Sequence, residues 1–207
     1  MKKTVIALFV FIAFIAASAF SQKIDDVFKT MPGSILPGLS ESNRTMLLVD
    51  TGKTTIPYPL GEIEKLAYSS DFLKIKTSEI GTTQLKLLPL INDTQIICVI
   101  KTVCGKACDS SIRFYSTEWK QLEAKTLLSD ISSTSFFDSS KKDSENYKFA
   151  LSLPDIYPVS AEFENGSNAL TLRLDLAGYL SDEQLAEVKP FIKSETITLN
   201  WNNTSFR

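Results

Sequence analysis

Residues Leu85–Trp119 read LKLLPLINDTQIICVIKTVCGKACDSSIRFYSTEW, and this stretch decides the fold. Between Ile96 and Val103 both alternating sets of positions are largely apolar, and many of the residues are β-branched. Such a run predicts a β-strand that is covered on both of its faces. Turn signals bound the run at Asn92-Asp93 and at 105–107. We therefore expect a three-stranded antiparallel meander with this strand at its centre.

The segments around this meander predict more strands and a few short helices. Alternation at Phe72–Thr77 predicts a preceding strand, so that the central meander lies around residues 72–116. Farther along, Asn165-Gly166 separates two alternating runs, which predicts a β-hairpin. A helix capped by Ser181 and a final strand at Thr196–Trp201 follow it. Because strands come in runs, the pattern predicts an α+β fold with an antiparallel sheet and a C-terminal hairpin–helix–strand.

The part of the chain before the meander predicts two short helices and a linker. The apolar residues of Ile24–Thr30 share one helical face, and Ser40 or Ser42 caps a second helix. Two prolines in Ile56–Gly61 favour an extended linker there.

The first residues have the three parts of a secretory signal. Lys2-Lys3 precede the apolar stretch Thr4–Ala16, and Ala17-Ser18-Ala19 offers small residues for cleavage. This order predicts a signal peptide over residues 1–21. The alternative is a membrane anchor, but the apolar stretch is shorter than the roughly 20 residues that a spanning helix needs. No second apolar span follows, so no transmembrane segment is expected after signal removal.

The remaining residues, 22–207, are expected to form a single exported α+β domain. An alternative is two halves, 22–128 and 145–207, joined by the serine-rich loop 129–144, which is expected to be mobile. Phe136-Phe137 inside this loop are unusual for a free linker, so we expect them to dock elsewhere.

The chain has three cysteines, and an odd number leaves at least one without an intramolecular partner. Cys104 and Cys108 flank the expected hairpin loop, so they are candidates for a structural disulfide. Two free thiols or a redox-active pair are the alternatives. Cys98 lies inside the central strand and is expected to be a buried free thiol. No metal site is expected, because three cysteines without histidine make a poor zinc ligand set.

Catalytic chemistry is narrowed by the absence of histidine, which excludes Ser-His-Asp and Cys-His nucleophile systems. Residues 47–52, LLVDTG, resemble an aspartic protease motif, but such an enzyme needs two aspartates and the chain holds one copy. Gly52-Lys53-Thr54 ends like a phosphate-binding loop, but Leu47 stands where the first glycine must be. Three acids near one segment are candidates for a catalytic carboxylate pair, but solvent-exposed faces explain them at least as well. They are Asp155, Glu162 and Glu164. No catalytic residue and no cofactor is therefore assigned.

The surface charge makes nucleic acid an unlikely partner, since the net charge is −2 and no basic tract is present. Aromatic residues near turns and strand ends are candidate binding contacts, because tyrosine and tryptophan dominate binding hot spots. The alternative is that most of them pack in the core. The candidates are Tyr58, Tyr68, Tyr157, Tyr179 and Trp201.

A long pattern at residues 87–122 resembles that of a known family. It comprises Leu87-Leu88-Pro89-Leu90, Ile97-Cys98-Val99, Thr102-Val103-Cys104-Gly105, Cys108-Asp109-Ser110-Ser111-Ile112, and Phe114-Tyr115 through Trp119-Lys120. Segments near Met31-Pro32 and at Val188–Phe191 extend the similarity. The family consists of exported Bacteroidales proteins classed only as a domain of unknown function. The resemblance implies bacterial export and one globular unit, but no activity, substrate or catalytic residue.

These observations together favour a non-catalytic binding module in the envelope of a Gram-negative bacterium, in the periplasm or at the cell surface. The partner is expected to be an envelope protein or a glycan. One alternative is an enzyme that works without histidine, through carboxylates or a cysteine. A thiol-dependent redox or assembly factor is the third possibility.

Overall fold

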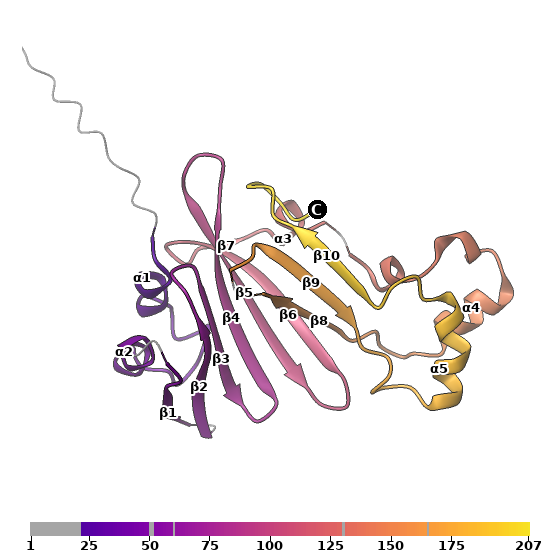
Figure 1. Ribbon diagram of the computed structural model, residues 1–207, viewed down its shortest axis with the longest axis horizontal. Coiled ribbons are helices and arrows are strands. Elements are labelled where there is room, and N and C mark those ends of the chain that lie inside the picture. Colours follow the sequence, from indigo (N-terminus) through magenta and orange to yellow (C-terminus); the bar gives the residue numbers. More distant parts are fainter. Residues whose placement is uncertain (1–21, 50–51, 60, 130, 165) are drawn as a thin grey trace, which may run out of the picture.

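The computed structural model describes residues 22–49, 52–59, 61–129, 131–164 and 166–207. The expected signal peptide at 1–21 lies outside the described residues. Two antiparallel sheets form the framework, and short helices flank them (Figure 1). This confirms the α+β class and the antiparallel character that the sequence predicts.

The larger sheet is a seven-stranded meander whose strands follow one another in chain order. Its strands are β1 (Thr55–Tyr58), β2 (Gly61–Tyr68), β3 (Phe72–Ser78), β4 (Gly81–Pro89), β5 (Gln95–Cys104), β6 (Cys108–Ser116) and β7 (Gln121–Leu122). The smaller sheet has the order β10-β9-β8, formed by β8 (Val159–Phe163), β9 (Ala169–Leu174) and β10 (Thr196–Asn200). The helices are α1 (Ile24–Lys29), α2 (Glu41–Val49), α3 (Ala124–Leu127), α4 (Glu145–Ser152) and α5 (Asp182–Val188). Short 3-10 turns are η1 (Ser133–Phe136), η2 (Ser139–Lys141) and η3 (Lys189–Phe191).

The central strand β5 is covered on both faces, as its apolar run predicts. Cys98 and Ile100 point to the inter-sheet core, the apolar cluster between β3–β6 and the smaller sheet. Ile97 and Val99 point to the helix-side core, which α1, α2 and the segment after α1 cover. In Figure 1 the two helices lie on one side of the large sheet, and β8–β10 lie on the other.

Two strands of the large sheet depart from the sequence expectation. The expected linker Ile56–Gly61 contributes to β1 and the start of β2, so the sheet has seven strands where a central meander was predicted. Strand β2 is hard to recognise because the buried position after Ile63 is Lys65, a charged residue. Its ammonium group donates to the Leu47 carbonyl oxygen at 2.6 Å, near the C-terminal end of α2, where a cation is favoured.

The serine-rich segment 129–144 is also more structured than a linker. It contains η1 and η2, and it buries Phe136 and Phe137 in the inter-sheet core. Phe114 and Phe163, one from each of the two expected halves, belong to this same core. Side chains from both sides of the segment therefore pack together.

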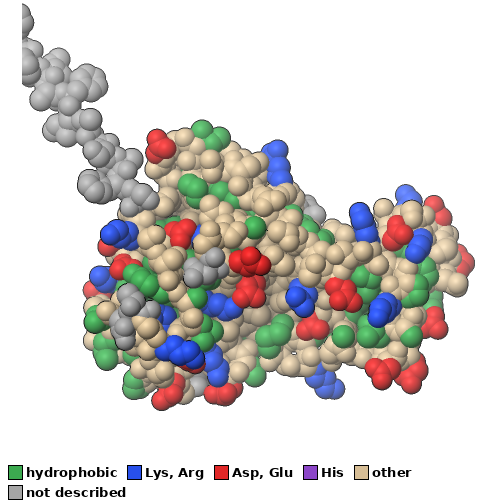
Figure 2. Space-filling view, in the orientation of Figure 1, with side chains coloured by type: hydrophobic (Ala, Val, Ile, Leu, Met, Phe, Trp, Pro, Cys, Tyr) green, Lys and Arg blue, Asp and Glu red, His purple; other side chains and the backbone are tan. Residues whose placement is uncertain are grey.

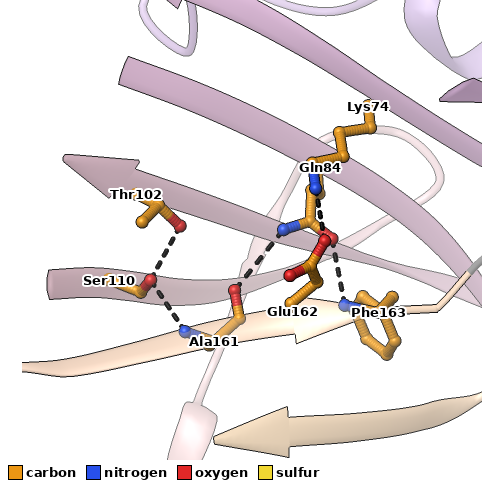
Figure 3. A network of polar contacts seen from close by, with 7 residues as sticks. All are labelled: Lys74, Gln84, Thr102, Ser110, Ala161, Glu162 and Phe163. Carbon is orange, nitrogen blue, oxygen red and sulfur yellow. Dashed lines mark hydrogen bonds and ion pairs between the residues drawn. The ribbon is translucent and has the colours of Figure 1, made fainter. Parts of the chain in front are cut away.

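The smaller sheet meets the larger one through the edge of β8, whose backbone groups bond to side chains of the large sheet (Figure 3). The N–H groups of Ala161 and Phe163 donate to Ser110 Oγ at 2.9 Å and to Gln84 Oε1 at 3.0 Å. Gln84 Nε2 returns a bond to the Ala161 carbonyl at 3.4 Å. Val159 N–H donates to Asp109 Oδ1 at 2.9 Å. Polar side chains thus satisfy a strand edge that would otherwise be left unpaired.

Candidate functional site

Strand β6 has one strand neighbour along its whole length and a second along only a small part. Strand β5 pairs with all of β6, whereas β7 pairs only with Phe114 and Tyr115. After β7 the chain turns into α3. No strand in the described part of the chain pairs with the outer side of Cys108–Arg113, which we call the open edge of β6.

The direction of the backbone groups along this edge follows from the ladder. Cys108 N–H donates away from β5, to Asp175 Oδ2 at 2.9 Å. In an antiparallel pair this direction alternates, so Ser110 and Ile112 also direct their N–H and C=O groups away from β5. These groups have the spacing that a further antiparallel strand needs.

An apolar groove of about 290 Å³ lies beside the open edge. Asp109, Ser110 and Ile112 of β6 form one wall. The other residues that line it are Leu128, Ile131, Val159, Ala161 and Leu172. We call this whole pocket the apolar groove. Its volume falls near the lower end of the roughly 300–1,000 Å³ typical of ligand pockets. A few side chains fit this space better than a whole cofactor does.

Two cations lie beside the open edge, on the face of the large sheet opposite the apolar groove. They are Lys101 of β5 and Arg113 of β6, and we call them the cationic pair. They line one small pocket together with Ser111, which is the cross-strand partner of Lys101. Partial burial, and then the charge of Arg113, lower the pKa of Lys101. The Lys101 ammonium donates to the carbonyl of Ile35. In the residues that the structure describes, neither cation forms an ion pair with a carboxylate.

Charge on the face of the molecule that Figure 2 draws is mixed. Figure 2 shows acidic and basic side chains interspersed over the face in view, without a broad field of one sign. Local groups such as the cationic pair, rather than a long-range field, therefore decide which charge a bound partner prefers.

The cysteine pair lies at the end of the open edge. The sulfur atoms of Cys104 and Cys108 are 2.07 Å apart, at bonding distance, and the residues face each other in the β5–β6 ladder. The loop between them packs tightly on the turn that contains Gly178. A Cβ at Gly178 would come within 1.8 Å of the Lys106 carbonyl oxygen, so only glycine permits this approach. The hairpin tip is thereby held against the smaller sheet's connection to α5.

The third cysteine has a different environment. Cys98 is fully buried in the inter-sheet core, and burial raises the pKa of its thiol. A buried neutral thiol packs as a small hydrophobe and is a poor nucleophile. In the described part of the chain, no three acidic or cysteine residues come together as a metal site.

Most of the candidate aromatics are half-buried, with their polar atoms bonded within the fold. Tyr58 Oη donates to the Pro37 carbonyl at 2.5 Å, and Trp201 Nε1 donates to the Pro89 carbonyl at 2.6 Å. Tyr157 donates to the carbonyl of Leu151.

Tyr68 Oη donates to Asp25 Oδ1 at 2.6 Å. This bond, with burial and the nearby negative charge, raises the pKa of Tyr68 to about 12. Tyr179 differs in being exposed, at 37%. None of these aromatics lines the apolar groove.

The acidic residues considered for catalysis, Asp155, Glu162 and Glu164, are all exposed. Glu162 forms an ion pair with Lys74 beside the Gln84 contacts (Figure 3). Another acid, Asp175, which the sequence does not single out, lies in a separate pocket of about 150 Å³, where it accepts the Cys108 N–H described above. In the protease-like stretch, Asp50 and Thr51 lie outside the described residues.

Comparisons with known proteins identify the chain's relatives without supplying an activity. The model of a family described as "Protein of unknown function (DUF3256)" matches residues 16–206. A domain of an uncharacterised protein from Porphyromonas gingivalis W83 has a similar solved structure, with a TM-score of 0.79 and 24% identity. The match covers 89% of this chain and 98% of that one, and it bears on the fold alone. No curated protein matches. Among the described residues, no helix is long and apolar enough to span a bilayer.

Proposed function

Because the chain belongs to the DUF3256 family, whose description assigns no function, we propose from its own geometry that it is a non-catalytic binding module of the bacterial envelope. The apolar groove beside β6 is the proposed binding site. We include export in this proposal on the basis of the signal-like residues 1–21. Oxidation of the Cys104–Cys108 pair is also included, because disulfides persist in exported proteins.

One observation carries the proposal: an unpaired strand edge lies next to an apolar groove. Proteins usually cover or block such edges, because they recruit other chains. The groove adds apolar side chains that gain free energy when a partner removes them from water. An open edge and an apolar groove in one place favour recognition of another molecule.

The side chains available for catalysis support binding over turnover. The sequence contains no histidine. The Cys98 thiol is buried, and the sulfurs of Cys104 and Cys108 are at bonding distance, so none is presented as an activated nucleophile. The groove itself has one carboxylate, Asp109, and that group accepts the Val159 N–H.

The proposal is tested by capture on the groove. The immobilised protein is incubated with solubilised envelope proteins and glycans of its host, alongside two isoleucine variants. Ile131→Lys places a charge in the apolar groove. Ile91→Lys is the matched control, because Ile91 is 74% exposed in the turn between β4 and β5. We expect wild type and Ile91→Lys to retain the same partner, and Ile131→Lys to lose it.

Turnover is measured in parallel against panels of peptide, glycan and ester substrates. We expect no product above the buffer control. Reproducible turnover that disappears when a single Asp, Glu or Cys is substituted would overturn the binding proposal, as would a partner held equally well by Ile131→Lys.

A further inference from the structure

We propose that the partner binds as an extended peptide that adds an antiparallel strand to the open edge of β6, through a core of one apolar, one acidic and one apolar residue. This inference rests on the proposed binding function, since it names the class of molecule that the apolar groove receives. The acidic residue faces Ser111, and the apolar residues face Ser110 and Ile112.

The backbone of β6 supplies the first argument. Ser110 and Ile112 direct their N–H and C=O groups outward, two residues apart, as a hydrogen-bonded antiparallel pair requires. The ladder between β6 and β7 already uses this side of β6 at Phe114. An incoming peptide therefore continues an existing row of bonds, and α3 limits it to a few residues. Strand addition of this kind is a common mode of peptide recognition.

The apolar groove supplies the second argument. Residues directly opposite each other in a ladder share one face of the sheet. Ser110 and Ile112 face the groove that Leu128, Ile131 and Val159 also line. The peptide residues opposite Ser110 and Ile112 therefore point into it. A groove of about 290 Å³ accommodates aliphatic side chains of this kind.

The cationic pair supplies the third argument, through charge complementarity. A peptide residue opposite Ser111 points to the other face, where Ser111 is small and exposed. Its diagonal neighbours on β6 are Arg113 and Asp109, and the Asp109 carboxylate is turned to the Val159 N–H. Lys101 lies across Ser111 on β5. Diagonal neighbours are roughly 7–8 Å apart, within reach of an arginine side chain. A carboxylate there is within reach of Arg113, and Lys101 adds positive charge nearby; neither cation has an acidic partner among the described residues.

The test uses a fluorescein-labelled, end-capped heptapeptide, STVEVTS, and fluorescence polarisation with the purified protein. Replacing the central glutamate by lysine should weaken binding about tenfold, because the charge at the cationic pair is reversed. Arg113→Glu should reverse this preference, so that the lysine peptide binds more tightly. Arg173→Glu, an exposed arginine on β9, is the matched control and should behave as wild type. Thermal unfolding establishes that both variants are folded.

Methylation of peptide amides separates strand pairing from simple insertion of side chains. In the proposed register the two valine N–H groups bond to β6, whereas the glutamate N–H points away. N-methylation at the valines should therefore weaken binding about tenfold or more, and N-methylation at the glutamate should be tolerated.

The outcomes distinguish this inference from the proposed function. Binding that survives methylation at the valines but is lost in Ile131→Lys overturns strand pairing and leaves the apolar groove as a binding site. Failure of every heptapeptide, while envelope capture still depends on Ile131, likewise overturns the peptide inference alone. Failure of the peptides together with capture that ignores Ile131 overturns both.

Discussion

The two edges of the seven-stranded sheet are built differently. At the β1 edge, Pro57 has no N–H group to offer, and its carbonyl accepts a bond from Asn43 Nδ2 of α2 at 3.4 Å. At the β6 edge, Ser110 and Ile112 present both kinds of backbone group beside the apolar groove. A protein that blocks one edge with proline and a helix, and leaves the other open, has a surface suited to recruiting a strand.

The two edges of the smaller sheet also differ, because the β8 edge is bonded along its length and the β10 edge is bonded only at its end. Gln84 and Ser110 bond the β8 edge to the large sheet. At the end of β10, Asn200 and Arg207 exchange two backbone hydrogen bonds, at 2.7 and 3.1 Å. The open edge of β6 has the apolar groove beside it, so we expect low amide protection and a capacity to bind there.

The largest effect is expected where a covered edge loses its partner. Gln84→Met keeps much of the side-chain volume but leaves the Phe163 N–H and Ala161 carbonyl without their bonds, in a site where Gln84 is 2% exposed. The free energy of unfolding should fall by about 2–4 kcal/mol, measured by urea denaturation. Gln121→Met, on the exposed part of β7, should change it by less than about 0.5 kcal/mol. Equal effects would show that the β8 edge does not depend on Gln84.

A smaller effect is expected at the cysteine pair, which holds the start of the open edge. Replacing Cys104 and Cys108 together by serine should lower the free energy of unfolding by about 2 kcal/mol, because the closed loop is short. A reducing agent should destabilise wild type similarly and leave the double variant unchanged, as followed by thermal unfolding.

Thiol counting in denaturant provides the accompanying chemical test. Protein from the native host should show one reactive thiol before reduction, from Cys98, and three after it. Three reactive thiols before reduction would contradict the bond.

The smallest effect concerns the β1 side, where Tyr68 of β2 bonds to Asp25 of α1. That hydrogen bond is the main cause that raises the pKa of Tyr68 from 10.0 to about 12. The folded protein keeps a proton that the unfolded chain loses, so this contribution to stability is complete below pH 10 and is lost as the pH rises towards 12. Urea denaturation of Tyr68→Phe should therefore show a shallower alkaline decline than wild type. Tyr179→Phe is the control, and an identical decline in Tyr68→Phe would refute the linkage.

Much of the framework could be predicted from local sequence. The apolar run at Ile96–Val103 identifies β5, because a strand covered on both faces needs apolar residues at both alternating positions. Ser181 identifies α5, where the structure contains a complete capping box with Gln184. Both patterns depend only on residues that are neighbours in the sequence, so they can be recognised without knowledge of the fold.

The open edge and the sheet-to-sheet contacts depend on distant residues, so they were missed. Gln84 and Ser110 look like solvent-facing polar residues until β8 crosses them. The buried Lys65 makes β2 hard to recognise from the sequence, because its hydrogen-bond acceptor, the Leu47 carbonyl, lies in another element. One local signal did exist for the open edge: the helix-forming residues at Ala124–Leu127 leave β7 only 2 residues long.

Amide hydrogen exchange along β6 measures directly whether the outer edge of this strand is open. Ser111 and Arg113 direct their N–H groups to β5, whereas Ser110 and Ile112 direct theirs to the open edge. We predict alternating protection, with the Ser110 and Ile112 amides exchanging about a hundredfold or more faster than those of Ser111 and Arg113, because only the latter are bonded within the sheet. Equal and strong protection at all four amides would show that the edge is already covered and cannot receive a further strand.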